Sequence, residues 1–130
     1  MVIETQLANV DLDIYSRTNL EPLVEAFGKK VFVLYVGPFR RSYKAVLELS
    51  GNAQSADAKM LAFCRLIRAL PRAERTLWDG ASVREFNIGL RGGMEPMTFE
   101  MTVSEKAVRA AAGVNARIGF TLYSPAMSAR

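Results

Sequence analysis

The side chains that most often perform catalysis are scarce in this sequence. Its 130 residues include no histidine and a single cysteine, Cys64. These counts exclude Ser-His-Asp and Cys-His catalysis, a histidine-ligated zinc site and any disulfide within the sequence. The carboxylates of Asp11 and Asp13 are left as candidates for acid–base chemistry or for binding a hard cation.

Asp11 and Asp13 are two residues apart in an alternating segment, so a strand would place them on one side. Each carboxylate would then raise the pKa of the other, but lysines and arginines are available to neutralise both, and no third carboxylate stands nearby to complete a cation site. Cys64 belongs to an apolar helical stripe, where a thiol packs and does not react. We therefore expect no catalytic residue, no metal site and no cofactor.

A basic, aromatic segment between two predicted strands is the first candidate binding site. Aromatic and arginine side chains supply contact area and bidentate hydrogen bonds, and they concentrate at interaction hot spots. The alternative is a charged turn that keeps a hairpin soluble, with its phenylalanine folded onto the core. The candidate residues are Phe39, Arg40, Arg41, Tyr43 and Lys44.

The polar side of the predicted sheet is the second candidate. Asp11, Asp13 and Tyr15 share one side of the first strand, and polar residues of other strands fall on the same side by the two-residue repeat. If no helix covers this side, it offers a platform of mixed charge to a protein or a polar small molecule. The alternative is a set of cross-strand ion pairs facing water. The further candidates are Arg91, Arg117 and Tyr123, with Asn87, Glu100 and Thr121 beside them.

Hydrophobic periodicity predicts the elements that would position these residues. The predicted strands are 9–16, 30–36, 42–49, 83–91, 97–103 and 116–123. Four helices are predicted. The first follows the caps at 18–19 and ends at Gly28, and the second covers 56–70. The third runs from Pro71 to Trp78, and the fourth from Ser104 to Gly113. The strand at 97–103 is expected to form a hairpin with the one at 83–91.

The resulting order is typical of an α+β fold with a mostly antiparallel sheet and helices on one face. Its start, βαββαβ, is ferredoxin-like, and an additional β-α-β follows. The segment 30–36 is apolar on both sides, so we expect it at the centre of the sheet or in an oligomer interface. Residues 1–125 are expected to form a single domain, with a flexible tail at 126–130.

Charge is uneven along a chain whose net charge is +4. Residues 29–75 hold ten bases and three acids, whereas residues 1–28 hold one base and five acids. The basic stretch indicates either an anionic partner or a surface neutralised by the acidic segment. Nucleic acid is an unfavoured partner because the aromatic strand residues that stack bases are few. No apolar run is long enough to span a membrane, and with one cysteine and no leader pattern we expect a cytoplasmic protein.

The order of elements, with the segments Ser104–Val108 and Gly113–Ile118 and the apolar strand ending at Tyr123, resembles an uncharacterised bacterial domain-of-unknown-function family. The resemblance covers most of 8–125, although positions 38–50 lack the tryptophan-containing strand of that family. It implies a small intracellular bacterial protein, some relatives of which are immunity proteins paired with toxins. It assigns no catalytic residue.

Two functions follow as expectations. The first is a non-enzymatic protein-binding module, immunity- or antitoxin-like, that contacts a protein partner through the 37–44 hairpin and the polar sheet face. The second is a small-ligand-binding regulatory domain of the amino-acid-sensing type, acting as a homodimer. Such a domain should carry a glycine in its strand-to-helix loop, and residues 16–19 have none. An enzyme that uses carboxylates, tyrosine and lysine or arginine is a third reading.

Overall fold

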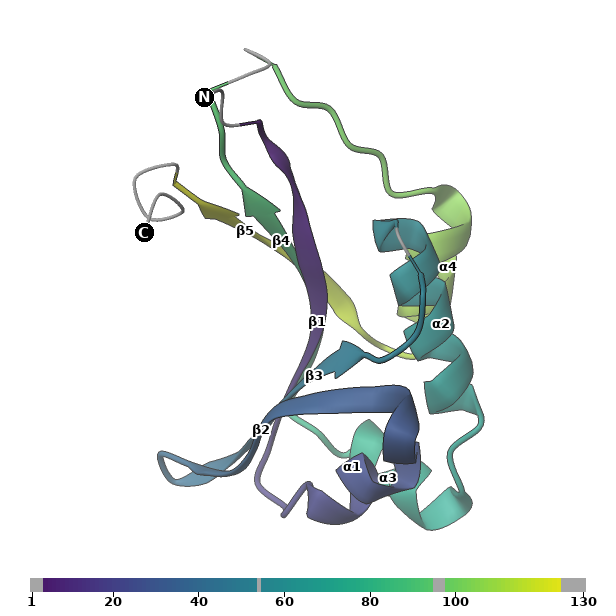
Figure 1. Cartoon of the computed structure of the whole chain (residues 1–130). Helices are drawn as coiled ribbons and strands as arrows, with labels where there is room; N and C mark the ends of the chain where they lie inside the picture. The colour runs from purple at the N-terminus through teal and green to yellow at the C-terminus, as the bar shows by residue number, and fades with distance from the viewer. Residues whose placement is uncertain (1–3, 54, 95–97, 125–130) are drawn as a thin grey trace.

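The first strand lies at the centre of the sheet in the computed structural model of this chain (Figure 1). Residues 4–53, 55–94 and 98–124 are described, and within them five strands form one sheet in the order β2-β3-β1-β4-β5. The predicted tail at 126–130 lies outside these residues. The strands are β1 (Gln6–Ser16), β2 (Val31–Phe39), β3 (Ser42–Leu49), β4 (Val83–Arg91) and β5 (Arg117–Tyr123).

The sheet is mixed and mostly antiparallel, as the sequence predicts. β1 pairs antiparallel with β3 on one side and with β4 on the other, and β2 pairs antiparallel with β3. β5 instead runs parallel to β4, because α4 (Glu105–Gly113) carries the chain across the sheet between them. β2 and β5 are therefore the two edge strands.

All the helices of the described residues lie on one side of the sheet (Figure 1). α1 (Glu21–Phe27) and α3 (Arg72–Asp79) contact each other, and α2 (Ala56–Arg68) packs against both α4 and β1. The side chains of Val10, Leu12 and Ile14 point from β1 into this layer and are fully buried. Alternation along β1 thus fixes which side of the sheet holds the core and which side stays open.

Local signals explain where the helices begin and end. The hydroxyl oxygens of Ser55 and Ser104 each accept a hydrogen bond from the backbone N–H three residues later, at 3.0 and 3.2 Å, as N-cap side chains do. Asp57 in the first turn of α2 accepts the backbone N–H of Ser104 at 3.0 Å, which joins the starts of α2 and α4. Gly28 ends α1 with a φ of 61°, a conformation that glycine adopts at little cost.

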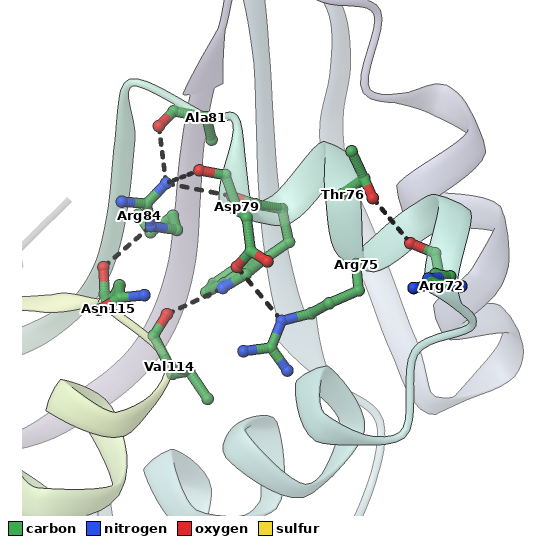
Figure 2. Close-up of polar contacts among 9 residues, drawn as sticks. Arg72, Arg75, Thr76, Asp79, Ala81, Arg84, Val114 and Asn115 are labelled. Carbon is green, nitrogen blue, oxygen red and sulfur yellow. Dashed lines mark hydrogen bonds and ion pairs between the residues drawn. The ribbon is translucent and has the colours of Figure 1, made fainter.

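Two side chains tie α3 to the end of α4 and the start of β5 (Figure 2). The buried indole of Trp78 donates to the carbonyl oxygen of Val114 at 2.9 Å. Arg84 on β4 donates to the carbonyl oxygens of Ala81 and Asn115, at 2.6 and 2.9 Å, and also to those at 78 and 79. These bonds satisfy the carbonyls at a helix end and a turn, which would otherwise lose hydrogen-bond partners on leaving water.

Two of the predicted strand placements are wrong. The described part of 97–103 is extended coil and not a strand, and the edge of β4 that it was expected to occupy pairs with β5. Met101 and Val103 nevertheless pack against the core, which explains their apolar alternation. The strand starting near residue 30 lies at the edge of the sheet, so the first of its two expected positions, the centre of the sheet, is wrong, and the second, an oligomer interface, stays a prediction.

The remaining predicted strands and helices are confirmed, with ends that agree within three residues. No helix in the described ranges is long and apolar enough to cross a membrane.

Candidate functional site

The open side of the sheet carries the polar residues of β1. Asp11, Asp13 and Tyr15 alternate with the buried core residues, and none of the helices described above covers them (Figure 1). All three are half-buried, because the neighbouring strands flank them. The predicted polar face therefore exists and is open.

Asp11 belongs to a short hydrogen-bonded chain. Its Oδ1 accepts the side-chain amide of Asn9 at 3.1 Å, and the Oδ1 of Asn9 accepts Lys59 Nζ from α2 at 3.1 Å. Burial raises the pKa of Asp11 from 3.8 to about 6, and the carboxylates of Asp13 and Glu48 add to this effect while Lys59 opposes it. The predicted repulsion between Asp11 and Asp13 is thus present, and burial contributes more than that repulsion does.

Asp13 is the less satisfied of the two carboxylates. Its Oδ1 is enclosed and has no hydrogen-bond partner in the described structure. Burial and the neighbouring Glu85 raise its pKa, and Lys44 opposes the rise. Among the described residues, no three His, Cys, Asp or Glu side chains are grouped so that they could hold a metal ion.

β4 and β5 add a second set of polar contacts to the open face. Thr121 donates to the side-chain oxygen of Asn87 at 3.1 Å, and Asn87 is opposite Asp11 in the register. Arg117 donates to Glu85 at 2.8 Å, which is a cross-strand ion pair of the kind that the sequence left as an alternative. The Arg117 guanidinium is therefore paired within the sheet.

Four predicted residues meet where the β2–β3 hairpin joins β1. Lys44 is opposite Tyr15 in the register, and Lys44 Nζ lies 4.6 Å from the ring centre of Phe39 and 5.5 Å from that of Tyr15. The two rings contact edge to face at 5.9 Å, and the Arg40 guanidinium lies 5.2 Å from the centre of the Phe39 ring. Phe39 therefore supports two cations on the open face and is not folded onto the hydrophobic core.

Other predicted site residues lie apart from this cluster. Tyr43 points to the helix side of β3 and packs against the core, so it is not accessible beside Lys44. Arg91 and Tyr123 are paired neighbours at the far end of β4 and β5. Glu100 lies in the coil that replaces the expected strand and is not on the sheet.

An exposed apolar patch lies on β2. Phe32, Val33, Leu34 and Tyr35 are consecutive and each is between 43% and 58% exposed. Their two-sided apolarity predicted a strand that is covered on both faces, either at the centre of the sheet or in an oligomer interface, and they were not predicted as binding residues. At an edge, the same pattern leaves hydrophobic side chains in water on both sides.

Cys64 is confirmed as a buried packing residue. Its side chain is fully enclosed in the core, and burial raises the pKa of the thiol more than Arg65 and Arg68 lower it. Such a thiol stays protonated and is a poor nucleophile.

Three comparisons with known proteins, by family models, by curated sequences and by solved structures, each returned no match. The geometry is therefore the basis for assigning a function. It offers the hydrogen-bonded carboxylate of Asp11, the half-buried carboxylate of Asp13, a cationic hairpin tip and an apolar edge strand.

Proposed function

We propose that this chain is a non-enzymatic protein-binding module whose docking surface is the edge strand β2 together with the hairpin tip. The single observation that carries the proposal is the run of exposed apolar side chains at Phe32–Tyr35, followed at the tip by Arg40 and Arg41. Burial of the exposed half of one such side chain contributes roughly 1 kcal/mol. A partner that wraps around the edge of β2 and reaches both sides of the strand would therefore gain an apolar centre for the interface.

The contact is made by side chains and not by strand addition. A bulge between Val33 and Tyr35 disturbs the pairing register, and Pro38 has no backbone N–H to donate. The Tyr35 hydroxyl also donates to the Pro38 carbonyl oxygen. These features are among those that keep exposed edges from pairing with other strands. The hydrophobic side chains remain free to meet a partner surface.

We propose that the contact surface of the partner has an apolar centre surrounded by acidic residues. Between residues 29 and 41 the chain has four cations and no acid, with Lys29 and Lys30 before β2 and Arg40 and Arg41 after it. A second copy of the chain would bring this same basic rim against itself, so charge disfavours a homodimer through this surface. An acidic protein surface would be attracted by both ends of the strand.

The conformation of Arg40 adds support. Its φ of 55° lies in the region that favours glycine, and holding a non-glycine residue there costs about 1–2 kcal/mol. A hairpin selected only for stability would carry glycine at this position. An arginine kept there in spite of the strain is consistent with a role for its side chain.

The finer expectations from the sequence stand as proposals. The strand order β2-β3-β1-β4 supports a ferredoxin-like unit from β1 to β4, to which α3, α4 and β5 are additions. The immunity-like role is the form that this function takes if the acidic partner is a toxin. A cytoplasmic location in a bacterium is proposed with it, from the sequence pattern and the family resemblance.

Photo-crosslinking tests the proposal. A photoreactive phenylalanine placed at Leu34 is expected to form adducts with a protein whose crosslinked region is acidic, identified by mass spectrometry. The same probe at Leu122, which is 68% exposed on the opposite edge strand, is the control and is expected not to capture that protein. Adducts only with a second copy of this chain, equal capture from both positions, or no adduct would overturn the proposal.

Binding of the purified partner then separates the apolar and the cationic contributions. Leu34→Glu is expected to weaken binding at least about tenfold because it buries an unpaired charge. Arg40→Gly removes the cation and keeps or relaxes the turn, so it should not lower the stability of the fold. It should weaken binding of the partner and make that binding less sensitive to salt than binding by wild type. Leu122→Glu is the matched control, and equal affinities of all variants would contradict the assignment of this surface.

A further inference from the structure

A hollow of about 600 Å³ opens between the end of β3 and α2, on the helix side of the sheet. Its walls come from Lys30, from Leu49 and the loop 50–53, and from the side of α2 that carries Ala62, Arg65, Leu66 and Ala69. Sites for small organic molecules in proteins have this size and are lined mainly by apolar groups with a few polar ones. The hollow therefore has the dimensions of a ligand site.

The hollow exists because α2 has two apolar stripes of different bulk. Met60, Phe63 and Ile67 fill the core, whereas Ala62, Leu66 and Ala69 form the adjacent stripe at helical spacing. Two of these three residues are alanines, so the helix leaves space where larger side chains would have closed the gap towards Leu49. The floor of the hollow is apolar and shallow enough to remain open to solvent.

The opposite wall is held in place by the loop after β3. The backbone N–H of Ser50 donates to the Lys30 carbonyl oxygen at 3.1 Å, and the Ser50 hydroxyl donates to that of Lys29 at 2.6 Å. These two bonds join the turn before β2 to the loop after β3. Lys30 is thereby fixed at the mouth of the hollow, opposite the helix.

The polar groups at the mouth are cationic. Lys30 and Arg65 are both exposed, and neither makes a salt bridge within the described residues. Of the residues that the structure describes, none that lines the hollow carries a carboxylate. Two cations facing one apolar space attract an anion, and Arg65 can bind a carboxylate or phosphate with two hydrogen bonds.

We infer that this hollow binds a small organic anion, in which an apolar body lies against α2 and a carboxylate or phosphate group meets Lys30 and Arg65. A free amino acid is a poor fit, because nothing lining the hollow would neutralise its ammonium group. The site differs in place from the amino-acid-type site expected at 16–19. The hollow lies beside the docking surface proposed above, and Lys30 is the one residue that belongs to both.

Isothermal titration calorimetry and thermal denaturation of the whole chain with four probes test the inference. The probes are sodium octanoate, octyl phosphate, octanol and octylamine, with inorganic phosphate as the control for the anion alone. One or both amphiphilic anions are expected to bind saturably at one site and to raise the melting temperature by several degrees. Octanol should bind more weakly and octylamine not at all, and comparison of the two anions separates carboxylate from phosphate recognition.

Three variants locate the binding. Arg65→Gln should lower the affinity for the more tightly bound anion about tenfold, because a charge-assisted hydrogen bond is lost. Arg68→Gln lies on the same helix but outside the hollow, and it should leave that affinity unchanged. Ala62→Phe should fill the space and abolish binding. Arg65→Gln keeps the test decisive if Ala62→Phe does not fold. The inference fails if neither anion binds, if octylamine binds as well as octanoate, or if Arg65→Gln binds like wild type.

Discussion

Asp11→Asn should stabilise the protein at neutral pH and flatten its dependence on pH. Folding moves the Asp11 carboxyl group into a half-buried setting near Asp13 and Glu48, and its pKa rises from 3.8 to about 6 even though Lys59 opposes the rise. The folded state therefore holds the proton more tightly than the unfolded state does. It follows that stability is lost as pH rises from about 4 through 6, and the full cost is present at pH 7.

The size of the effect follows from this pKa difference. A rise of this size would correspond to about 3 kcal/mol if water did not screen the group. Because Asp11 is half exposed, screening reduces the expected cost to about 1 kcal/mol. Asparagine keeps an oxygen that accepts the Asn9 amide at 3.1 Å, so the substitution removes the charge with little loss of hydrogen bonding. A gain of about 1 kcal/mol corresponds to about 3–5 °C in melting temperature for a chain of this length.

Thermal and urea denaturation between pH 4 and pH 8 would measure the effect. Wild type and Asp11→Asn are expected to agree near pH 4 and to separate by about 1 kcal/mol at pH 7. Glu25→Gln, which neutralises an exposed carboxylate on α1, is the control and should parallel wild type. If Asp11→Asn gave a curve parallel to wild type across this range, or lowered stability at pH 7, the assigned proton affinity of Asp11 would be refuted.

Two substitutions and one labelling experiment test the packing on the helix side of the sheet and at the junction of α3 with β5. Trp78→Phe leaves the Val114 carbonyl oxygen without its buried donor and should lower the free energy of unfolding by about 2 kcal/mol in urea titrations; a loss below about 0.5 kcal/mol would contradict the bond at 2.9 Å. Arg84→Lys cannot reach the same set of carbonyls, so amide exchange in β5 should accelerate, and unchanged exchange would count against the clamp. Cys64 should react with a thiol reagent only in denaturant, because burial raises its pKa; rapid labelling of the folded protein would disprove its enclosure.

Local patterns were sufficient for most elements but not for the edges of the sheet. The alternation of β1 predicted both its strand and its open polar face, and the serine caps at 55 and 104 marked two helix starts. The alternation at 97–103 predicted a hairpin, yet Met101 and Val103 pack against the core from a coil, and β5 takes the free edge of β4 after the α4 crossover. Packing against a core produces the same periodicity in both cases, so the sequence could not distinguish them.

In the candidate site, too, the features formed by adjacent residues could be predicted, and those that depend on which strands pair could not. The hairpin at 37–44 could be read from the sequence, but its turn was expected at Gly37 and Pro38. These two residues instead pair within β2, and the turn lies at 40–41. The contact of Lys44 with Tyr15 depends on β3 pairing with β1, which no local signal specifies. The apolar patch on β2 was misplaced for the same reason, because two-sided apolarity reports composition and not position in the sheet.

The central place of β1 has a consequence during biosynthesis. This strand leaves the ribosome before either neighbour, yet Leu12 pairs with Leu47 on one side and with Phe86 on the other. Its backbone stays without sheet partners until β3 emerges, and its second edge stays free until β4 has also been translated. A nascent chain stalled between these points would display a half-formed sheet, so a chaperone would find its target in this strand rather than in the helices.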